Sequence, residues 1–402
     1  MLTRRRFLAV FPSFAATVAS ATQAFAAFPL RRKKPPPPVP AYVYFGTDTS
    51  KGVSTGIYMS RFDTVKGNLT SPVLAAHIAK PTYLALSPPL NGNRFLYALN
   101  AFNASTSAAT TFGIAAGTGA LKQLGEVPVG GNDPACMSID TTGHAAFVAN
   151  FDSSVSSFRI LPNGTLSPPV DHIEFKDPQK FGALGPHQDA SHPHSVTISP
   201  DDRFLLVSDL GTDQISVFLI DPETGNLSVQ KLFTNNRPGS GPRHIIFHPN
   251  GRWVYGINEL DSTIDRYLWT ATRFSDTPQG MLISTNEPVK TIAPDFPVAK
   301  NAASELAISP DGAFLYASNR GEDSLVVFSI SEKDGRLTLV QRISCGGKTP
   351  VHFALGPTSE WLVCANQNSA NVTVFHRDGG TGKLAGPTQT VSLDSPMFLL
   401  FA

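Results

Sequence analysis

The sequence is poor in the features that would indicate a disulfide-rich, helical or highly charged protein. Three of its 402 residues are cysteines, and charged residues make up 16% of the chain. Cys136, Cys345 and Cys364 form no Cys-x-x-Cys pair and cannot all be bridged. We expect buried, reduced thiols, with a Cys345–Cys364 disulfide as the alternative. No segment has the apolar periodicity of a convincing helix, which favours an all-β protein.

The chain also lacks a basic stripe and a long apolar run. Residues 1–40 contain seven Lys or Arg and no acidic residue, which leaves 25 basic and 31 acidic residues in 41–402. A mildly acidic body argues against nucleic acid as a partner. The apolar run near the N-terminus is too short for a spanning helix, so we expect no stable membrane span.

The N-terminus has the pattern of an export signal. Thr3–Leu8 reads TRRRFL, an Ala-rich apolar run follows to about Ala21, and Ala24–Ala26 provides a small-x-small cleavage site. The pattern predicts a twin-arginine signal peptide over residues 1–26, with the twin-arginine export machinery as a partner and a periplasmic or secreted location. An uncleaved membrane anchor is the alternative. Residues 27–40, which contain RRKK followed by PPPP, predict a basic, Pro-rich tether.

Seven copies of one motif run through the rest of the chain. Each copy has Pro or Ala, an apolar stretch, a turn of Ser-Pro-Asp-Gly type and an aromatic-rich strand ending near Asn, and the last copy stops after one strand. The copies begin at Pro81, Pro134, Pro193, Pro242, Ala302, Pro350 and Pro396. A period of about 46 to 60 residues, built from short alternating strands, is typical of β-propellers.

The two ends of this repeat array complement each other. Pro396–Ala402 supplies a single strand, whereas the first strands, Tyr42–Gly46 and Gly56–Phe62, lack an inner strand. We predict that the C-terminal strand joins the N-terminal blade and closes a ring, because closure removes open sheet edges. The fold class is then an all-β, seven-bladed β-propeller with four antiparallel strands per blade, as one domain over residues 41–402. Two β-sandwich domains would need a linker midway, and none is visible.

Charged residues and histidines interrupt the repeat at four places where apolar residues would be easier to pack. The interruptions are His192-Pro193-His194, Gly241-Pro242-Arg243-His244, Asn258-Glu259-Leu260 and Asn319-Arg320-Gly321, with Glu305 on an inner strand. In a propeller, inner-strand starts and second-strand ends lie at the channel mouth, so these residues can converge. Ionised groups beside a low-dielectric channel are costly unless paired or used. They indicate a ligand or catalytic site; an Arg–Glu network that only ties neighbouring blades together is the alternative.

Four segments around these residues carry a family resemblance. They read HPHSVTISPDDRFLLVSDLGTDQISVF, SGPRHIIFHPNGRWVYGINELDSTID, SPDGAFLYASNRGEDSLVVFSI and HFALGPTSEWLVCANQNSANVTVF. Together with YVYFGTDTSKGVSTGIYMSRFD at the start, they resemble the lactonase family of seven-bladed propellers over essentially all of residues 41–402. That family contains a class of bacterial 6-phosphogluconolactonases and the fungal carboxy-muconate lactonising enzyme. The resemblance places its site on His192, His194, Arg243, Glu259 and Arg320.

The resemblance implies hydrolysis of a small-molecule lactone without a cofactor. Such a reaction needs a general base, for which we expect His194 or Glu259, with His192 a further candidate. Arg243 and Arg320 would orient the substrate and stabilise an oxyanion. We expect His192, His244 and Glu305 to bind substrate. No metal is required; a metal on the His-x-His pair is the alternative, although further ligands at fixed spacing are missing.

Departures from the family pattern affect the identity of the substrate. Ala101, Ala307 and Val351 stand where many relatives have charged or polar side chains, and Cys136 stands where His is common. Because a phosphorylated sugar lactone is a cytosolic metabolite and the chain carries an export signal, we expect an unphosphorylated sugar (aldono)lactone in the periplasm. Two alternatives stay open. One is a non-catalytic periplasmic propeller that binds a ligand or protein, and the other is a muconate-type lactonising cycloisomerase.

Overall fold

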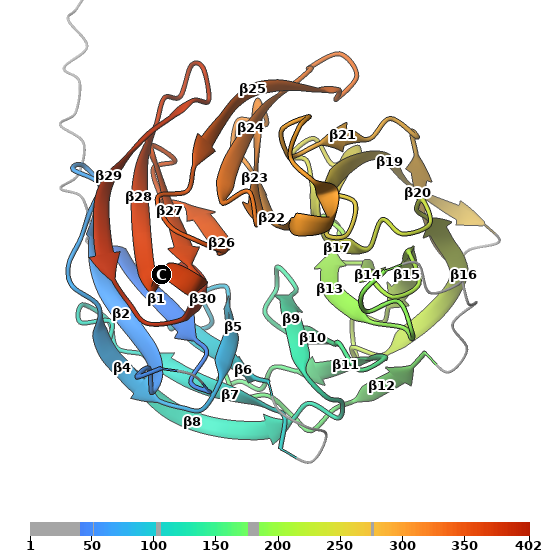
Figure 1. Ribbon diagram of the computed structural model, residues 1–402. Helices are drawn as coiled ribbons and strands as arrows, with labels where there is room; N and C mark the ends of the chain where they lie inside the picture. The colour runs from blue at the N-terminus through green and yellow to red at the C-terminus, as the bar shows by residue number, and fades with distance from the viewer. Residues whose placement is uncertain (1–40, 51, 102–105, 176–184, 275–276) are drawn as a thin grey trace, which may run out of the picture. The chain divides into compact units, whose positions relative to one another are not determined.

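In the computed structural model, the chain divides into Met1–Pro37 and one compact unit, Pro38–Ala402. The structure describes residues 41–50, 52–101, 106–175, 185–274 and 277–402. The predicted signal peptide and tether lie outside the described residues and stay predictions. In the unit Pro38–Ala402, antiparallel strands form seven sheets arranged as blades around a centre (Figure 1). The predicted seven-bladed β-propeller is confirmed.

Each blade runs from an inner strand at the centre to a fourth strand at the rim. Blade 1 holds the first and last strands, and blades 2 to 7 follow in chain order. For blades 2 to 7 and then blade 1, the inner strands are β5 (Pro81–Leu86), β9 (Pro134–Ile139), β13 (Pro193–Ile198), β17 (Pro242–Phe247), β22 (Ala302–Ile308), β26 (Pro350–Leu355) and β30 (Pro396–Phe401). In the same order, the second strands are β6 (Phe95–Asn100), β10 (Ala145–Asn150), β14 (Phe204–Asp209), β18 (Trp253–Asn258), β23 (Phe314–Arg320), β27 (Trp361–Asn366) and β1 (Ala41–Thr47).

The outer half of each blade consists of a third and a fourth strand. The third strands are β7 (Ala108–Ile114), β11 (Ser154–Arg159), β15 (Gln214–Ile220), β19 (Thr263–Phe274), β24 (Ser324–Ile330), β28 (Asn371–Arg377) and β2 (Gly56–Asp63). The fourth strands are β8 (Leu121–Pro128), β12 (Asp171–Glu174), β16 (Leu227–Asn235), β20 (Thr277–Ser284), β25 (Leu337–Ser344), β29 (Leu384–Ser392) and, in blade 1, β3 (Asn68–Leu69) and β4 (Val73–His77). A short strand, β21 (Val289–Lys290), also pairs with β19.

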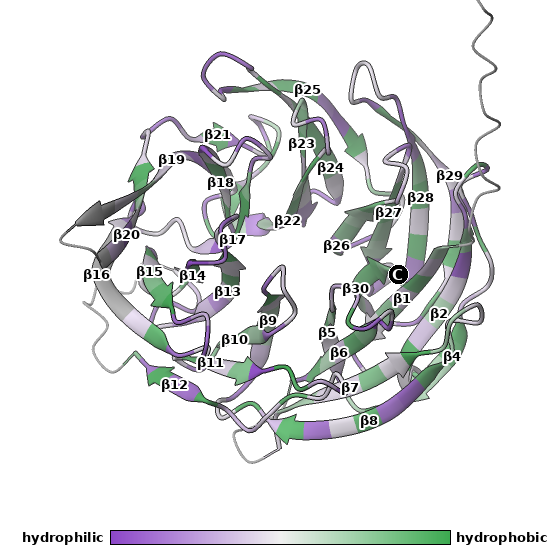
Figure 2. Cartoon of the chain, turned by 180° about the vertical axis from the view of Figure 1, so that it is seen from behind, coloured by the Kyte–Doolittle hydropathy of each residue, from purple (hydrophilic) through white to green (hydrophobic). Residues whose placement is uncertain are grey.

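Burial follows the position of a strand in its blade. All six residues of β6, β10, β14, β18 and β27 are buried, because neighbouring blades cover both faces of each sheet. At the rim, β8 mixes polar and apolar residues and is mostly exposed (Figure 2). Within the described ranges, helix is limited to η1 (Val298–Lys300) and η2 (Gln367–Ser369), and no helix there has the length and hydropathy to cross a bilayer.

The ring closes as predicted, through pairing of the last strand with the first. Residues of β30 lie antiparallel to β1, with Leu399 opposite Phe45. Leu399 packs in a buried cluster with Phe45 from blade 1 and with Trp361 and Val363 from blade 7. The closing strand therefore contributes both hydrogen bonds within blade 1 and apolar contacts to blade 7.

Every inner strand is bulged near its start. The register of each inner strand shifts against its second strand, so that one residue, or two in β22, is left without a partner. The bulged residues are Thr82, Ala135, His194, Arg243, Ser304 with Glu305, Val351 and Met397. A bulge re-aims a side chain that would otherwise follow the alternation of the strand. These positions are the ones that form the site described below.

The closing strand yields a stability prediction. Leu399 is 1% exposed, so Leu399→Ala should lower the free energy of unfolding by about 2–5 kcal/mol. Leu339→Ala on β25, where the side chain is 49% exposed, should change it by less than about 0.5 kcal/mol. Urea unfolding followed by tryptophan fluorescence measures both. Equal effects of the two substitutions would contradict the packing of the closing strand.

Candidate active site

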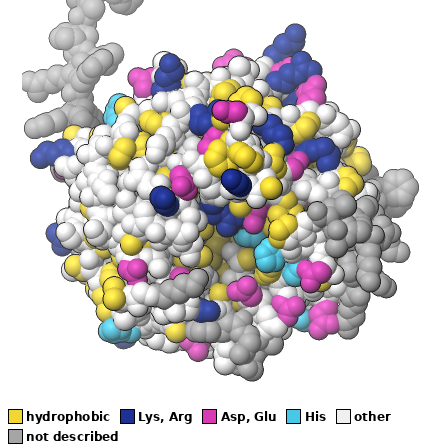
Figure 3. Space-filling model, in the orientation of Figure 1, with side chains coloured by type: hydrophobic (Ala, Val, Ile, Leu, Met, Phe, Trp, Pro, Cys, Tyr) yellow, Lys and Arg dark blue, Asp and Glu magenta, His cyan; other side chains and the backbone are white. Residues whose placement is uncertain are grey.

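A cavity of about 320 Å³ lies where the seven inner strands begin. Figure 3 shows one face hollowed near its centre, with histidine and hydrophobic side chains among charged ones. One bulged residue from each blade lines the cavity: Thr82, Ala135, His194, Arg243, Glu305, Val351 and Met397. Residues at the ends of second strands, or just after them, add Ala101, Phe151, Leu210, Glu259 and Arg320. The repeat thus builds most of the site from two structural positions.

The structure brings six of the seven predicted site residues into this cavity. They are His194, Arg243, His244, Glu259, Glu305 and Arg320. All six come from the neighbouring blades 4, 5 and 6, so the polar part of the site occupies one side of the cavity. Chain segments more than one hundred residues apart meet there.

His192 was predicted to bind substrate, but it is not among the residues that line this cavity. The residue precedes β13, and its Nδ1 lies 2.8 Å from the Phe151 carbonyl while its Nε2 lies 3.2 Å from Asp189. Its ring stacks on Phe151 with centroids 4.5 Å apart. The bulge at His194 interrupts the alternation at the start of β13, and of the two histidines His194 lines the cavity. His192 instead supports Phe151, which lines the cavity.

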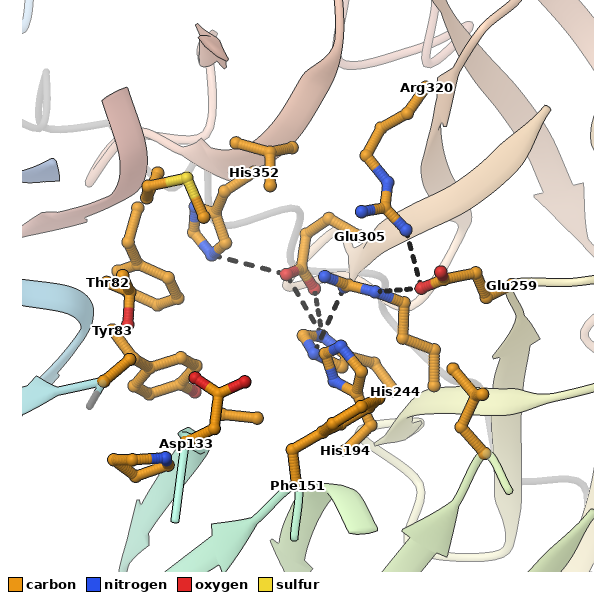
Figure 4. A pocket seen from close by; sticks show the side chains of 18 of the residues that line it. Thr82, Tyr83, Asp133, Phe151, His194, His244, Glu259, Glu305, Arg320 and His352 are labelled. Carbon is orange, nitrogen blue, oxygen red and sulfur yellow. Dashed lines mark hydrogen bonds and ion pairs between the residues drawn. The ribbon is translucent and has the colours of Figure 1, made fainter. Parts of the chain in front are cut away.

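Glu259 holds two arginines from neighbouring blades (Figure 4). Arg243 Nε donates to Glu259 Oε2 at 2.9 Å, and Arg320 Nη2 lies 2.6 Å from the same oxygen. Arg243 Nη1 also donates to the Ser304 carbonyl at 2.8 Å, and Arg320 Nε donates to the Ala302 carbonyl at 3.3 Å. The arginines are therefore fixed in position, and blades 5 and 6 are tied together.

These contacts set the charges of the cluster. Burial acts to raise the pKa of Glu259, but the charges of Arg320 and Arg243 outweigh it and lower the pKa below its ordinary value. Burial, together with the charge of Arg320, lowers the pKa of Arg243 to about 10. At neutral pH both arginines are cationic and Glu259 is anionic.

The glycines of the two arginine motifs permit this geometry. Gly241 has a φ of +64°, and a Cβ there would lie 2.6 Å from Leu260 Cγ. Gly321 has a φ of +142°, and a Cβ there would lie 2.1 Å from the Lys300 carbonyl oxygen. Both positions need glycine because L side chains rarely adopt these conformations.

Glu305 hydrogen-bonds with His244 and lies within ion-pair distance of His352. His244 Nδ1 lies 3.1 Å and His352 Nε2 3.4 Å from Glu305 Oε2. The Leu399 amide donates to His352 Nδ1, and Arg243 Nη1 donates to His244 Nε2. The nitrogens that face Glu305 are therefore Nδ1 of His244 and Nε2 of His352.

His194 differs from the other site histidines because its Nδ1 is buried without a hydrogen-bond partner. Its ring lies 5.2 Å from that of His244 and packs edge-on against Phe151. Burial lowers the pKa of His194 well below 6.5, and the nearby positive charge of Arg243 adds to this effect. The imidazole is therefore neutral at neutral pH and able to accept a proton.

The comparisons with known proteins agree with this geometry. The model of the family "Lactonase, 7-bladed beta-propeller" matches residues 42–401. The chain belongs to this family. It is 35% identical to a 6-phosphogluconolactonase of Formosa agariphila, over 85% of this chain and 94% of that protein. A 6-phosphogluconolactonase of Bacillus subtilis is 31% identical, over 89% of this chain and 97% of that protein.

A solved structure gives a further comparison for this lactonase-family propeller. The periplasmic gluconolactonase PpgL of Pseudomonas aeruginosa has a TM-score of 0.79 and 30% sequence identity, and the match covers 90% of this chain and 99% of that chain. The family expected from sequence motifs is confirmed.

Sequence reasoning missed several lining residues of this lactonase-family site. His352 could have been found, since Pro350-Val351-His352 repeats the spacing of Pro242-Arg243-His244. Tyr83 carries no comparable signal; its hydroxyl lies 3.4 Å from Cys136 Sγ, and burial raises its pKa well above 10. Asp133 precedes β9 and also lines the cavity.

Two of the four residues noted as departures from the family pattern line the cavity. Ala101 and Val351 do so, whereas Ala307 packs against the buried cluster that contains Tyr316 and Phe353. Elsewhere in the described chain, Cys136, Cys345 and Cys364 are buried and unbridged. No group of three His, Cys, Asp or Glu among the described residues has the arrangement of a metal site.

His352 yields a pH prediction. Burial lowers its pKa from 6.5 to about 4, so between these values the unfolded chain binds a proton that the folded chain does not. The free energy of unfolding should therefore fall as the pH falls from 6.5 toward 4, by about 2–3 kcal/mol for this group near pH 4.5. His352→Gln should remove that part of the slope in urea titrations at several pH values. His144→Gln, in an exposed turn, should retain it; an unchanged slope in His352→Gln would contradict the assignment.

Proposed function

We propose that the protein hydrolyses the ester bond of a lactone, and that the cavity at the inner-strand starts is its active site. One observation carries the proposal: the neutral imidazole of His194 lines the cavity beside two arginines held on one carboxylate. A base and fixed cations are what ester hydrolysis requires. The names of the family relatives support the same reaction.

His194 is the favoured general base. Glu259 was the other candidate from the sequence, but its carboxylate is engaged by two guanidinium groups that lower its pKa. His194 accepts a proton from water as the water oxygen bonds to the lactone carbonyl carbon. The carbonyl π electrons move to oxygen and give an oxyanion. Protonated His194 then supplies the proton to the ring oxygen when the ring C–O bond breaks and the carbonyl re-forms.

The arginines stabilise the oxyanion. Arg243 uses Nε and Nη1, and Arg320 uses Nε and Nη2, in the contacts described above. Nη2 of Arg243 and Nη1 of Arg320 have no partner among the described residues, so they remain as donors. Because Glu259 orients both groups before the substrate binds, little reorganisation is needed as negative charge develops.

The proposed substrate is an unphosphorylated sugar lactone met in the periplasm. The predicted twin-arginine signal supports export to the periplasm. A phosphorylated sugar lactone is not the expected metabolite in that compartment. The similarity to a periplasmic gluconolactonase from P. aeruginosa supports the same compartment and substrate class. Localisation of the full chain by cell fractionation tests this part separately from the chemistry.

The activity prediction concerns His194. On gluconolactone in a pH-stat, with the buffer rate subtracted, His194→Gln should lower kcat by about 10²–10⁴-fold. His172→Gln, on rim strand β12, should retain the wild-type rate. The pKa of His194 is well below 6.5. As the pH falls, kcat should therefore stay constant through pH 6.5 and decline only well below that value, where the imidazole becomes protonated.

Rates equal to buffer on gluconolactone, its 6-phosphate and muconolactones would instead favour a binding protein. A His194→Gln variant as active as wild type would remove the proposed base. These two results overturn different parts of the proposal.

A further inference from the structure

The bulged inner-strand positions are charged or ionisable on one side of the cavity and uncharged on the other. At the bulged positions, blades 4, 5 and 6 present His194, Arg243 and Glu305. The other four blades present Thr82, Ala135, Val351 and Met397, which we call the uncharged arc. Behind this arc, the rings of Tyr83 and Phe398 pack with centroids 4.2 Å apart.

The cations of the cavity are already compensated. Arg243 and Arg320 both contact Glu259, at 2.9 and 2.6 Å. Apart from histidines, the charged residues that line the cavity in the described chain are these two arginines and the three carboxylates of Asp133, Glu259 and Glu305. A phosphate group needs arginine forks or lysines that are not already paired, and both arginines in the lining of this cavity are paired with Glu259.

Asp133 adds a carboxylate to the cavity on the side of the uncharged arc. It immediately precedes β9, and its φ of +48° starts the turn into that strand. In Figure 4 its carboxylate points into the cavity on the same side as Thr82 and Tyr83, opposite Glu259 and Arg320. A charged group bound against the uncharged arc would therefore meet a carboxylate.

We propose that the uncharged arc receives the part of the lactone remote from its carbonyl, and that this subsite together with Asp133 selects an uncharged substituent and rejects a phosphate. The inference rests on the proposed lactone hydrolysis, in which the carbonyl lies at Arg243 and Arg320. The remote end of the ring then falls on the opposite wall. There a hydroxymethyl group can contact the Thr82 hydroxyl and apolar side chains. Because the group is uncharged, it needs no counter-charge from the protein.

The test compares kcat/KM for gluconolactone and its 6-phosphate. For the wild-type protein we expect a preference of about 100-fold or more for the neutral lactone, because like-charge contacts cost several kcal/mol. Val351→Arg should reduce the preference at least about tenfold, through a gain on the phosphorylated lactone. Val351 is the bulged residue of blade 7, and the equivalent residue of blade 5 is Arg243. An arginine can therefore occupy a bulged position of this kind.

Asp133→Asn is a second variant that keeps the shape of the site, and it should also reduce the preference. Leu339→Arg, on exposed β25, adds the same charge as Val351→Arg outside the cavity and should leave the preference unchanged. Equal kcat/KM for both lactones in the wild-type protein would overturn the inference and leave lactone hydrolysis intact. A preference unchanged in both Val351→Arg and Asp133→Asn would also overturn it. If neither lactone is hydrolysed, the proposed function fails together with the inference.

Discussion

The pairing of β30 with β1 is the contact on which the geometry of the site depends. A closed ring places the seven inner-strand starts around one centre, so that one bulged residue per blade reaches the same cavity. The closing strand also takes part directly. Met397 and Phe398 line the cavity, and the Leu399 amide donates to His352 Nδ1. Ring closure, burial of Leu399 and orientation of a site histidine are therefore coupled.

Charge compensation then decides what the cavity can do. Ionised groups at the centre of the ring would be costly if they were isolated. Glu259 compensates two arginines, and Glu305 lies beside two imidazoles. The Arg–Glu contacts thus tie blades 5 and 6 together and also fix the cations beside His194. The structural and the catalytic interpretations of these residues describe the same contacts.

Much of the fold and of the site could be predicted because the repeated motif is recognisable in the sequence. Prolines at the inner-strand starts and an unpaired strand at each end predicted the ring and its closure. Charged interruptions of an apolar repeat identified six residues that line the cavity. His192 does not line the cavity, and this has a physical reason: a bulge of one residue changes which side chains face the channel. Alternation alone does not show where a bulge lies.

Other parts of the site could not be read from residue type. Tyr83 and Phe398 occupy strand positions where aromatic residues are expected in any core, so their place on the cavity wall follows only from the ring. His352 stands at the offset of His244, but its neighbour is Val351 rather than arginine, and the charge that marked the other motif is missing. Asp133 lies in a turn, where aspartate is ordinary for reasons of backbone conformation.

The central claim is that residues of separate blades act on one substrate in one cavity. A double-mutant cycle between His194 in blade 4 and Arg320 in blade 6 tests it most directly, with kcat/KM on gluconolactone measured for His194→Gln, Arg320→Lys and the double variant. The account predicts a coupling of at least about 1 kcal/mol, so that the double variant loses less than the product of the single losses. Losses that multiply to within about twofold would show that the two residues act independently, and would contradict the shared site.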